Sequence, residues 1–272
     1  MATQQQKADG FRALHARAGA FVIPNPWDAG SARFLAALGY EALATTSAGF
    51  AFSLGRPDGS VTLEEKLAHC RVLCAATDLP VSADLENCFA DDPQTAAKTI
   101  LRAAETGLVG GSIEDYSGSA IYDFGLALER VQAAVEAARS LGFRFTLTAR
   151  AENLIRGRID LDDTIRRLQA FDAAGADVLY APGLKTLEEV RLVTGAVGKP
   201  VNVLITGMQG VSVQSLGGSG AKRISVGGAL ARAAIGALLR AAKQMQSPGT
   251  FGWVDEAAPG AEIVKLLGAW KT

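Results

Sequence analysis

Leu108-Val-Gly-Gly-Ser-Ile-Glu114 and Phe143-Arg-Phe-Thr-Leu-Thr-Ala149 flank a longer segment, Gly125 to Leu141, that is rich in Ala, Leu, Glu and Arg. The two short runs carry apolar or β-branched residues in the pattern of strands, whereas the longer segment has the period of an amphipathic helix. A strand, a helix and a second strand in this order form a parallel crossover unit. The stretch therefore predicts one βα repeat followed by the start of the next.

The same alternation extends over nearly the whole chain. The strand-like runs are Phe21 to Pro24, Ala42 to Thr46, Pro80 to Asp84, Leu108 to Glu114, Phe143 to Ala149, Ala176 to Tyr180, Pro200 to Ile205 and Arg223 to Val226. The intervening helical segments are Ala29 to Leu38, Leu63 to Thr77, Asp92 to Thr106, Gly125 to Leu141, Asp160 to Ala174 and Thr186 to Thr194. Eight units without a linker favour a closed (β/α)₈ barrel, a TIM-type α/β fold. An open doubly wound sheet would use a glycine fingerprint after the first strand, where Pro24-Asn-Pro-Trp-Asp28 stands instead.

Further helical sequence follows the eighth strand. Ala229 to Met245 and Ala261 to Trp270 are amphipathic, and a Ser-Pro-Gly break separates them. Extra helices with an apolar face predict a contact between subunits. We therefore expect residues 1–272 to form one barrel domain, with roughly residues 229–272 in the subunit contact of a homo-oligomer. The alternative is that these helices pack across the floor of their own barrel.

The composition excludes several classes of protein. The 272 residues carry a net charge of −1, from 27 Lys and Arg against 28 Asp and Glu, and this balance argues against nucleic-acid or membrane-surface partners. A hydrophobic fraction of 49% argues against disorder. Three cysteines do not suit a disulfide framework, and no apolar leader or membrane span is visible. These features predict a cytoplasmic protein.

Acidic side chains gather at the predicted carboxyl ends of neighbouring strands. Apolar residues must face the helices, so period-two alternation turns Asp84, Glu86 and Glu114 toward the barrel interior. The same parity places Arg150 inside after the fifth strand and Asn202 inside on the seventh. Asn202 could bind substrate or fill a barrel layer. Active sites of such barrels lie at this end.

This cluster carries an excess of negative charge. Arg150 can neutralise only one of the three carboxylates, and an uncompensated carboxylate in a barrel mouth is unfavourable. A divalent cation would balance the excess, and oxygen ligands without His or Cys favour Mg²⁺ or Mn²⁺ over zinc. The alternative is a solvated network of ion pairs at the barrel rim.

Several motifs along the chain resemble the isocitrate lyase and phosphoenolpyruvate mutase superfamily. They are Asn25-Pro-Trp-Asp28 with Ser31-Ala-Arg33, Thr45-Thr-Ser-Ala-Gly49, Ser82-Ala-Asp-Leu-Glu86, Ser112-Ile-Glu-Asp115, Thr148-Ala-Arg150 and Arg223-Ile-Ser-Val-Gly-Gly228. The resemblance implies an α/β barrel whose eighth helix is swapped between subunits of a dimer or tetramer. It also implies a Mg²⁺ that chelates a small α-oxo acid.

The resemblance assigns roles to single residues. Asp84 would bind the metal directly, with Glu86 and Glu114 reaching it through water, and Arg150 would pair with the substrate and stabilise the enolate. The remaining implied contacts are the substrate-carboxylate site Ser47, Ala48 and Gly49, the apolar wall Trp27, and a mobile acid, Asp58, in the loop Gly55-Arg-Pro-Asp-Gly59.

The loop after the fourth strand departs from the lyase pattern. Lyases of this superfamily that cleave isocitrate or methylisocitrate carry Lys-Lys-Cys-Gly-His there, whereas this chain has Asp115-Tyr-Ser-Gly-Ser-Ala-Ile-Tyr-Asp123. The departure disfavours isocitrate-type cleavage and indicates the mutase-like branch. The candidate proton carriers of this loop are Tyr116, Ser117, Ser119 and Tyr122, and the sequence does not choose among them.

The predicted chemistry is cleavage next to a carbonyl. Breaking such a bond leaves an enolate, and a bidentate metal with Arg150 would place positive charge where the oxyanion forms. We expect a Mg²⁺-dependent lyase or decarboxylase for a small, oxaloacetate-like α-oxo acid. Two alternatives stay open. One is a mutase or hydrolase acting on the P–C bond of phosphonopyruvate, and the other is a non-catalytic protein that binds a 2-oxo acid such as 2-oxoglutarate.

Overall fold

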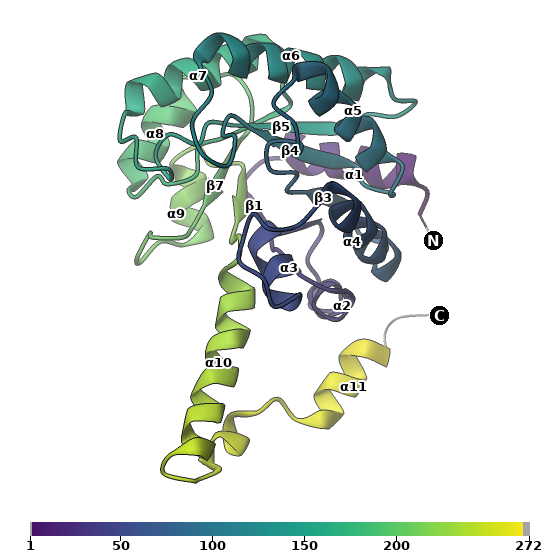
Figure 1. Ribbon diagram of the computed structural model, residues 1–272, viewed down its shortest axis with the longest axis vertical. Helices are drawn as coiled ribbons and strands as arrows, with labels where there is room; N and C mark the ends of the chain where they lie inside the picture. Colours follow the sequence, from purple (N-terminus) through teal and green to yellow (C-terminus); the bar gives the residue numbers. More distant parts are fainter. Residues whose placement is uncertain (1, 269–272) are drawn as a thin grey trace.

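Eight parallel strands form one sheet that curls into a nearly closed barrel in the computed structural model, which describes residues 2–268 (Figure 1). The strands are β1 (Phe21–Ile23), β2 (Leu43–Ala44), β3 (Val81–Ala83), β4 (Gly110–Glu114), β5 (Thr146–Arg150), β6 (Val178–Tyr180), β7 (Val201–Leu204) and β8 (Arg223–Ser225). Strands β1 and β2 are the two edges of the hydrogen-bonded sheet and do not pair as strands with each other. Ala44 N–H nevertheless donates to Pro24 O at 3.1 Å, which connects the two edges. The predicted (β/α)₈ TIM-type fold is confirmed.

Helices surround this sheet, and most begin at a capping residue. They are α1 (Gln4–Ala16), α2 (Ala29–Ala37), α3 (Ser47–Ser53), α4 (Leu63–Ala76), α5 (Pro93–Ala104), α6 (Phe124–Ser140), α7 (Leu161–Ala173), α8 (Leu187–Gly195), α9 (Val213–Gly218), α10 (Ala229–Gln246) and α11 (Gly260–Gly268), with a short 3₁₀ helix at Gly252–Glu256. Thr62 and Thr186 each close a capping box at the start of α4 and α8. None of the helices in residues 2–268 is long and apolar enough to cross a membrane.

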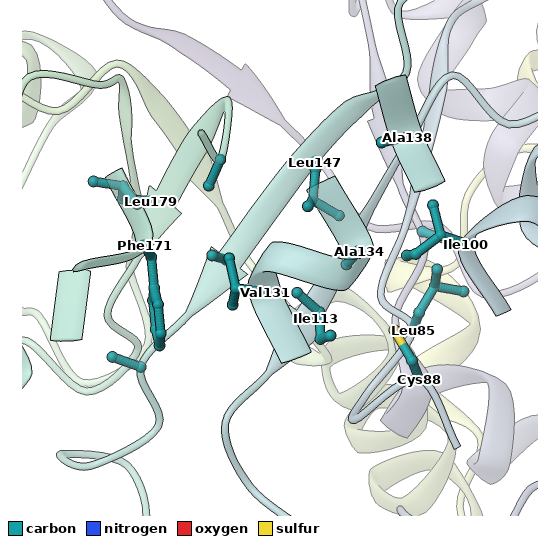
Figure 2. Packing of buried hydrophobic residues seen from close by; sticks show 14 of the residues in the cluster. Leu85, Cys88, Ile100, Ile113, Val131, Ala134, Ala138, Leu147, Phe171 and Leu179 are labelled. Atoms are coloured by element: carbon teal, nitrogen blue, oxygen red, sulfur yellow. The ribbon is translucent and has the colours of Figure 1, made fainter. Parts of the chain in front are cut away.

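The outer face of the sheet packs on the helices through small and branched side chains. Ile113 of β4 and Leu147 of β5 belong to the same buried cluster as Val131 and Ala134 of α6 (Figure 2). This outward packing turns the alternate residues of β4 and β5 into the barrel, as the period-two pattern predicts. At the other end of the barrel, Phe11 of α1 is fully buried against the strands and closes the floor.

The C-terminal helices do not pack across the barrel floor. Helix α10 starts after β8 at the mouth and projects away from the barrel, and α11 returns to lie beside α2 (Figure 1). Ala231 is the only residue of α10 that is fully buried. Among the apolar side chains that remain exposed are Leu238 and Leu239. Trp270, the expected end of the last helix, lies outside the described residues.

Candidate active site

A cavity of about 590 Å³ opens at the carboxyl ends of the strands. The predicted site residues that line it are Ser47, Ala48, Asp58, Asp84, Glu86, Glu114, Arg150 and Asn202. Strands β4, β5 and β7, helix α3 and the loops after β3 and α3 contribute these residues, so the barrel brings together side chains that are far apart in the sequence. This location matches the end of the barrel at which TIM-type enzymes carry out their chemistry.

Two of the predicted substrate contacts, Trp27 and Gly49, are not among the residues that line the cavity. A Cβ on Gly49 would lie 2.9 Å from Trp27 Cβ and 2.6 Å from Thr46 Cγ2, so glycine allows α3 to approach the loop after β1. Gly49 N–H donates to Thr46 Oγ1 at 3.2 Å and thereby caps α3. In this structure the two residues pack together behind the cavity wall.

Arg150 joins three carboxylates at the centre of the site. Its Nη1 lies 2.8 Å from Glu114 Oε1 and 3.0 Å from Asp84 Oδ1, and its Nη2 lies 2.9 Å from Glu152 Oε1. Glu114 and Arg150 are register partners on β4 and β5, so the sheet itself sets them side by side. The guanidinium also lies 4.7 Å from the centroid of the Tyr180 ring. The side chain is therefore held in one orientation from several directions.

Asp84 stays ionised at the base of the cavity. Ser47 Oγ donates to Asp84 Oδ2 at 3.1 Å. Burial opposes ionisation of Asp84, but the positive charges of Arg150 and Lys66 outweigh it and lower the pKa of this carboxyl. The result is an anionic oxygen cluster beside a fixed cation.

The third strand is shorter than the sequence predicts. Strand β3 ends at Ala83, so Asp84 follows the strand directly, and Glu86, with φ +51°, lies in the turn after it. The expected strand parity is thus wrong for these two residues, although both line the cavity. Burial and the neighbouring Asp84 charge raise the pKa of Glu86 to about 7. Glu86 Oε1 is buried without a hydrogen-bond partner.

Arg150 is not the only cation near these acids. Arg156 Nε lies 3.3 Å from Glu152 Oε2, and Arg156 Nη2 lies 3.8 Å from Glu114 Oε2. Lys66 of α4 is fully buried, and its charge acts on Asp84. Glu152, also fully buried, adds a fourth carboxylate that the sequence indicates only by its place two residues after Arg150. The site therefore holds more charge of both signs than strand parity predicts.

The carboxylates are suited to a hydrated divalent cation rather than to a complete protein cage. No group of three His, Cys, Asp or Glu side chains within residues 2–268 is arranged to enclose a metal ion. Asp84 and the unpartnered, buried Glu86 Oε1 nevertheless offer oxygen ligands at the cavity wall. Mg²⁺ typically takes one or two carboxylates and keeps several waters, so the donor set fits this ion.

The loop after β4 is a tight turn. Ser117 N–H donates to Ala120 O at 2.9 Å, and Tyr116 pairs with Ile121 in an isolated bridge. Tyr116 and Ser117 line the cavity, whereas Ser119 does not. The fourth candidate, Tyr122, is buried outside the cavity and donates its phenol hydrogen to Asp91. Two of the four candidate residues thus line the cavity, and their hydroxyls donate to carbonyls of the turn, Tyr116 to Gly118 O and Ser117 to Ala120 O.

Asn202 and Cys88 are two further candidates from the sequence, and the structure gives neither of them a free reactive group. Asn202 Nδ2 donates to Ser225 Oγ at 2.9 Å, and Asn202 Oδ1 accepts from Arg223 Nε at 2.8 Å. Asn202 therefore serves as a satisfied polar residue of the barrel interior, and it also lines the cavity. Cys88 is fully buried, and burial raises the pKa of its thiol to about 12, so it is not a reactive thiol.

Acidic and basic side chains that converge in a cavity at the carboxyl ends of the strands are the arrangement of an active site in TIM-type enzymes. The model of the phosphoenolpyruvate phosphomutase family matches residues 11–246, and the chain belongs to this family. It is an enzyme of the isocitrate lyase/phosphoenolpyruvate mutase superfamily, so the non-catalytic alternative is set aside.

Individual relatives agree with this placement. A crystal structure from Burkholderia cenocepacia J2315, provisionally described as a lyase/mutase, is 57% identical with a TM-score of 0.95, and 97% of each chain is covered. The 2-methylisocitrate lyase of Escherichia coli is 30% identical over 72% of this chain and 69% of that protein. The oxaloacetate decarboxylase of Bradyrhizobium diazoefficiens is 30% identical over 54% of this chain and 53% of that protein.

Proposed function

We propose that this protein is a Mg²⁺- or Mn²⁺-dependent lyase or decarboxylase that cleaves the C–C bond next to the carbonyl of a small, oxaloacetate-like α-oxo acid. The observation that carries the proposal is the position of Arg150, fixed by Asp84 and Glu114 at the carboxyl end of the barrel. Cleavage of such a bond creates negative charge on the former keto oxygen. A preoriented cation that touches this oxygen stabilises the charge as it develops.

The carboxylates supply the other half of the proposed site. Asp84 would bind the metal directly, and Glu86 and Glu114 would hold waters of its coordination shell. The bound cation would act as a Lewis acid toward the carboxylate and keto oxygens of the substrate. Ser47 and Ala48 lie at the same wall of the cavity and are proposed to contact the substrate carboxylate.

No side-chain nucleophile is needed for this reaction. Arg150 would balance the negative charge of the enolate. A hydroxyl group of the loop after β4 is proposed to protonate the enolate or to exchange a proton with the leaving carbon. Tyr116 and Ser117 are the loop hydroxyls that line the cavity. Asp58, exposed in the loop between α3 and α4, is proposed to approach the metal as the loop moves.

Cleavage or rearrangement of a P–C bond is the second candidate. The matching family model describes a phosphomutase, and phosphonopyruvate also yields an enolate when its P–C bond breaks. The shortness of the turn at Tyr116–Ile121 favours C–C cleavage, because a longer polar loop would be expected to hold a migrating phosphoryl group. The similarity to an oxaloacetate decarboxylase points the same way.

A substrate panel and one variant test the proposal. Purified enzyme with Mg²⁺ is expected to release pyruvate from oxaloacetate or a substituted malate faster than from phosphonopyruvate. Asp84→Ala is expected to lose both turnover and Mn²⁺ binding while retaining its circular dichroism spectrum. Absence of pyruvate from every substrate, or unchanged Mn²⁺ binding in the variant, would contradict the proposed site.

We further propose that residues 1–272 form a single barrel domain and that the chain assembles as a homo-oligomer through roughly residues 229–272. Helix α10 projects from the barrel with Leu238 65% and Leu239 52% exposed. Apolar side chains in this arrangement need a partner surface. A second copy of the chain would cover them.

A further inference from the structure

Arg223 is a buried cation that the proposed chemistry does not use. It is the first residue of β8, it is 6% exposed, and it lines the cavity. Its Nε donates to Asn202 Oδ1 at 2.8 Å, and its Nη2 donates to Thr148 Oγ1 at 3.0 Å. Its Nη1 is buried without a hydrogen-bond partner. The guanidinium therefore keeps unused hydrogen-bond donors inside the barrel.

The charge of Arg223 is not balanced by a carboxylate within residues 2–268. Both of its hydrogen-bond partners are neutral, whereas Arg150 and Arg167 each form ion pairs with carboxylates. Burial lowers the pKa of Arg223 to about 10, so the guanidinium keeps its charge at neutral pH. A buried charge without an opposite charge is strongly unfavourable, so this side chain requires an anion that the described residues do not supply.

A second unpartnered group lies at the same level of the barrel interior. Ser112 of β4 and Thr148 of β5 are register partners, and Thr148 is the residue that accepts from Arg223. Ser112 lines the cavity, yet its Oγ is buried and has no hydrogen-bond partner. The cavity thus reaches a level that presents a guanidinium and an unbonded hydroxyl, two groups that donate hydrogen bonds to an anion.

This level lies below the carboxylates of the barrel mouth. Thr148 precedes Arg150 by two residues on the inward face of β5, so the two levels are about 7 Å apart along the strand. Neutral and mostly small side chains line the cavity inside the barrel, among them Ser82, Ser112, Thr148, Asn202 and Ser225. Such a lining suits an anion no larger than a carboxylate group, and a four-carbon dicarboxylate can span the two levels.

We propose that Arg223 and Ser112 form an anion site inside the barrel, beneath the proposed catalytic centre, and that this site takes a small monovalent anion. The anion is either a free inorganic ion such as chloride or one carboxylate group of the substrate. In the second case the enzyme selects α-oxo acids that carry another carboxylate, and this case rests on the proposed function. Either ligand supplies the negative charge that the buried guanidinium lacks.

Bromide is the probe for this site, because it resembles chloride and its anomalous scattering identifies it in a crystal. In crystals of the wild type grown with sodium bromide, we expect an anomalous peak beside Arg223 Nη1 and Ser112 Oγ. In solution, without metal or substrate, bromide at about 100 times its Kd should raise the Tm by about 5 °C or more, because it binds only the folded state. Sodium isethionate, which is a larger anion, keeps the ionic strength constant.

Variants separate this site from binding elsewhere. Arg223→Met removes the charge and is expected to lose the bromide-dependent rise in Tm. Ser112→Ala is a milder change that should weaken bromide binding about tenfold, because one hydrogen bond to a charged group is lost. Arg17→Met, which removes an exposed arginine paired with Glu41, should leave the rise unchanged. The crystal of the wild type keeps the test decisive if Arg223→Met does not fold.

Kinetics with oxaloacetate and Mg²⁺ distinguish the two sources of the anion. If the substrate carboxylate occupies the site, bromide should raise KM and leave kcat unchanged, and Arg223→Met should raise KM at least about tenfold, the effect of losing one charged hydrogen bond. If a free ion occupies the site, bromide should bind in the crystal while KM stays insensitive to its concentration. Both results support the anion site.

Two results would overturn the inference. One is a rise in Tm with bromide that is as large in Arg223→Met as in the wild type, because the anion would then bind elsewhere. The other is a wild type without a bromide peak at Arg223, together with an Arg223→Met variant whose KM equals that of the wild type. Turnover of oxaloacetate in that second case would leave the proposed function standing. Bromide at Arg223 in a protein that turns over no α-oxo acid would refute the proposed function and leave the anion site.

Discussion

Arg150 and Glu114 are register partners on adjacent strands, and Arg150 Nη1 lies 2.8 Å from Glu114 Oε1. Burial raises the pKa of Glu114 well above its ordinary value; Arg150 opposes this rise, and Glu152 adds to it. The guanidinium of Arg150 therefore favours ionisation of this buried acid more strongly than the more distant Arg156 does. Its removal should affect both stability and chemistry.

Arg150→Gln is expected to lower kcat/KM by about 10² to 10³ because the developing oxyanion loses a fixed donor. It should also lower the free energy of unfolding at pH 8 by about 3 kcal/mol, since Asp84, Glu114 and Glu152 lose their shared partner. Steady-state kinetics and urea denaturation measure the two effects. Arg17→Gln, which breaks an exposed ion pair with Glu41, should change neither by a comparable amount. A kcat/KM within fivefold of the wild type would remove Arg150 from the chemistry.

The raised pKa of Glu86, about 7, predicts a pH dependence of stability for the metal-free protein. The folded state holds a proton on Glu86 that the unfolded chain releases near pH 4.5, so this stabilising contribution is complete below pH 4.5 and is lost as the pH rises through 7. Glu86→Gln should therefore stabilise the metal-free protein by about 1 to 3 kcal/mol at pH 8.5 and by little at pH 4.5. Chemical denaturation at the two pH values tests this difference, and an equal effect at both would contradict it.

The same group should make metal affinity depend on pH. A protonated Glu86 cannot hold the cation or its waters as an anion, so Mn²⁺ binding by the wild type should weaken as the pH falls from 8 to 6. In Glu86→Gln the affinity should be lower at pH 8 and vary less between these values. Mn²⁺ titrations at several pH values provide the measurement. A pH profile that the substitution leaves unchanged would place the titrating group elsewhere.

The proposed function assigns proton transfer to a hydroxyl of Tyr116 or Ser117. We expect Tyr116→Phe or Ser117→Ala to lower kcat by at least about tenfold, within the range of general acid catalysis. Tyr122→Phe offers a matched control, because its phenol donates to Asp91 outside the cavity. This control should lower the thermal stability and leave kcat unchanged. Full turnover in both Tyr116→Phe and Ser117→Ala would exclude the loop as the proton source.

The exposed apolar residues of α10 predict that assembly depends on this helix. Leu238→Glu together with Leu239→Glu should reduce the molecular mass in solution to that of a smaller species, because a charge cannot be buried unpaired in a subunit contact. Light scattering after size-exclusion chromatography measures the mass. Lys199→Glu, on an exposed loop away from α10, should leave the mass unchanged. A double variant with the wild-type mass would place the contact elsewhere.

The barrel and part of its site follow from local sequence alone. The period of two on β4 and β5 turns Ile113 outward and Glu114 and Arg150 inward, because successive side chains of a strand alternate between its faces. The helical period and the capping residues set the helices that separate the strands. Such local rules need no knowledge of distant contacts, and the fold they predict is the one observed.

Only the tertiary structure decided the electrostatics of the site. Asp84 follows the end of β3 and Glu86 lies in a left-handed turn instead of a strand. Lys66, which the sequence shows only as a lysine among apolar residues, is fully buried on α4. Trp27 belongs to a motif that resembles the superfamily, yet it is not among the residues that line the cavity. Chain order determines which residues alternate, whereas burial, pKa and charge balance depend on which distant elements pack together, and these are properties of the folded barrel as a whole.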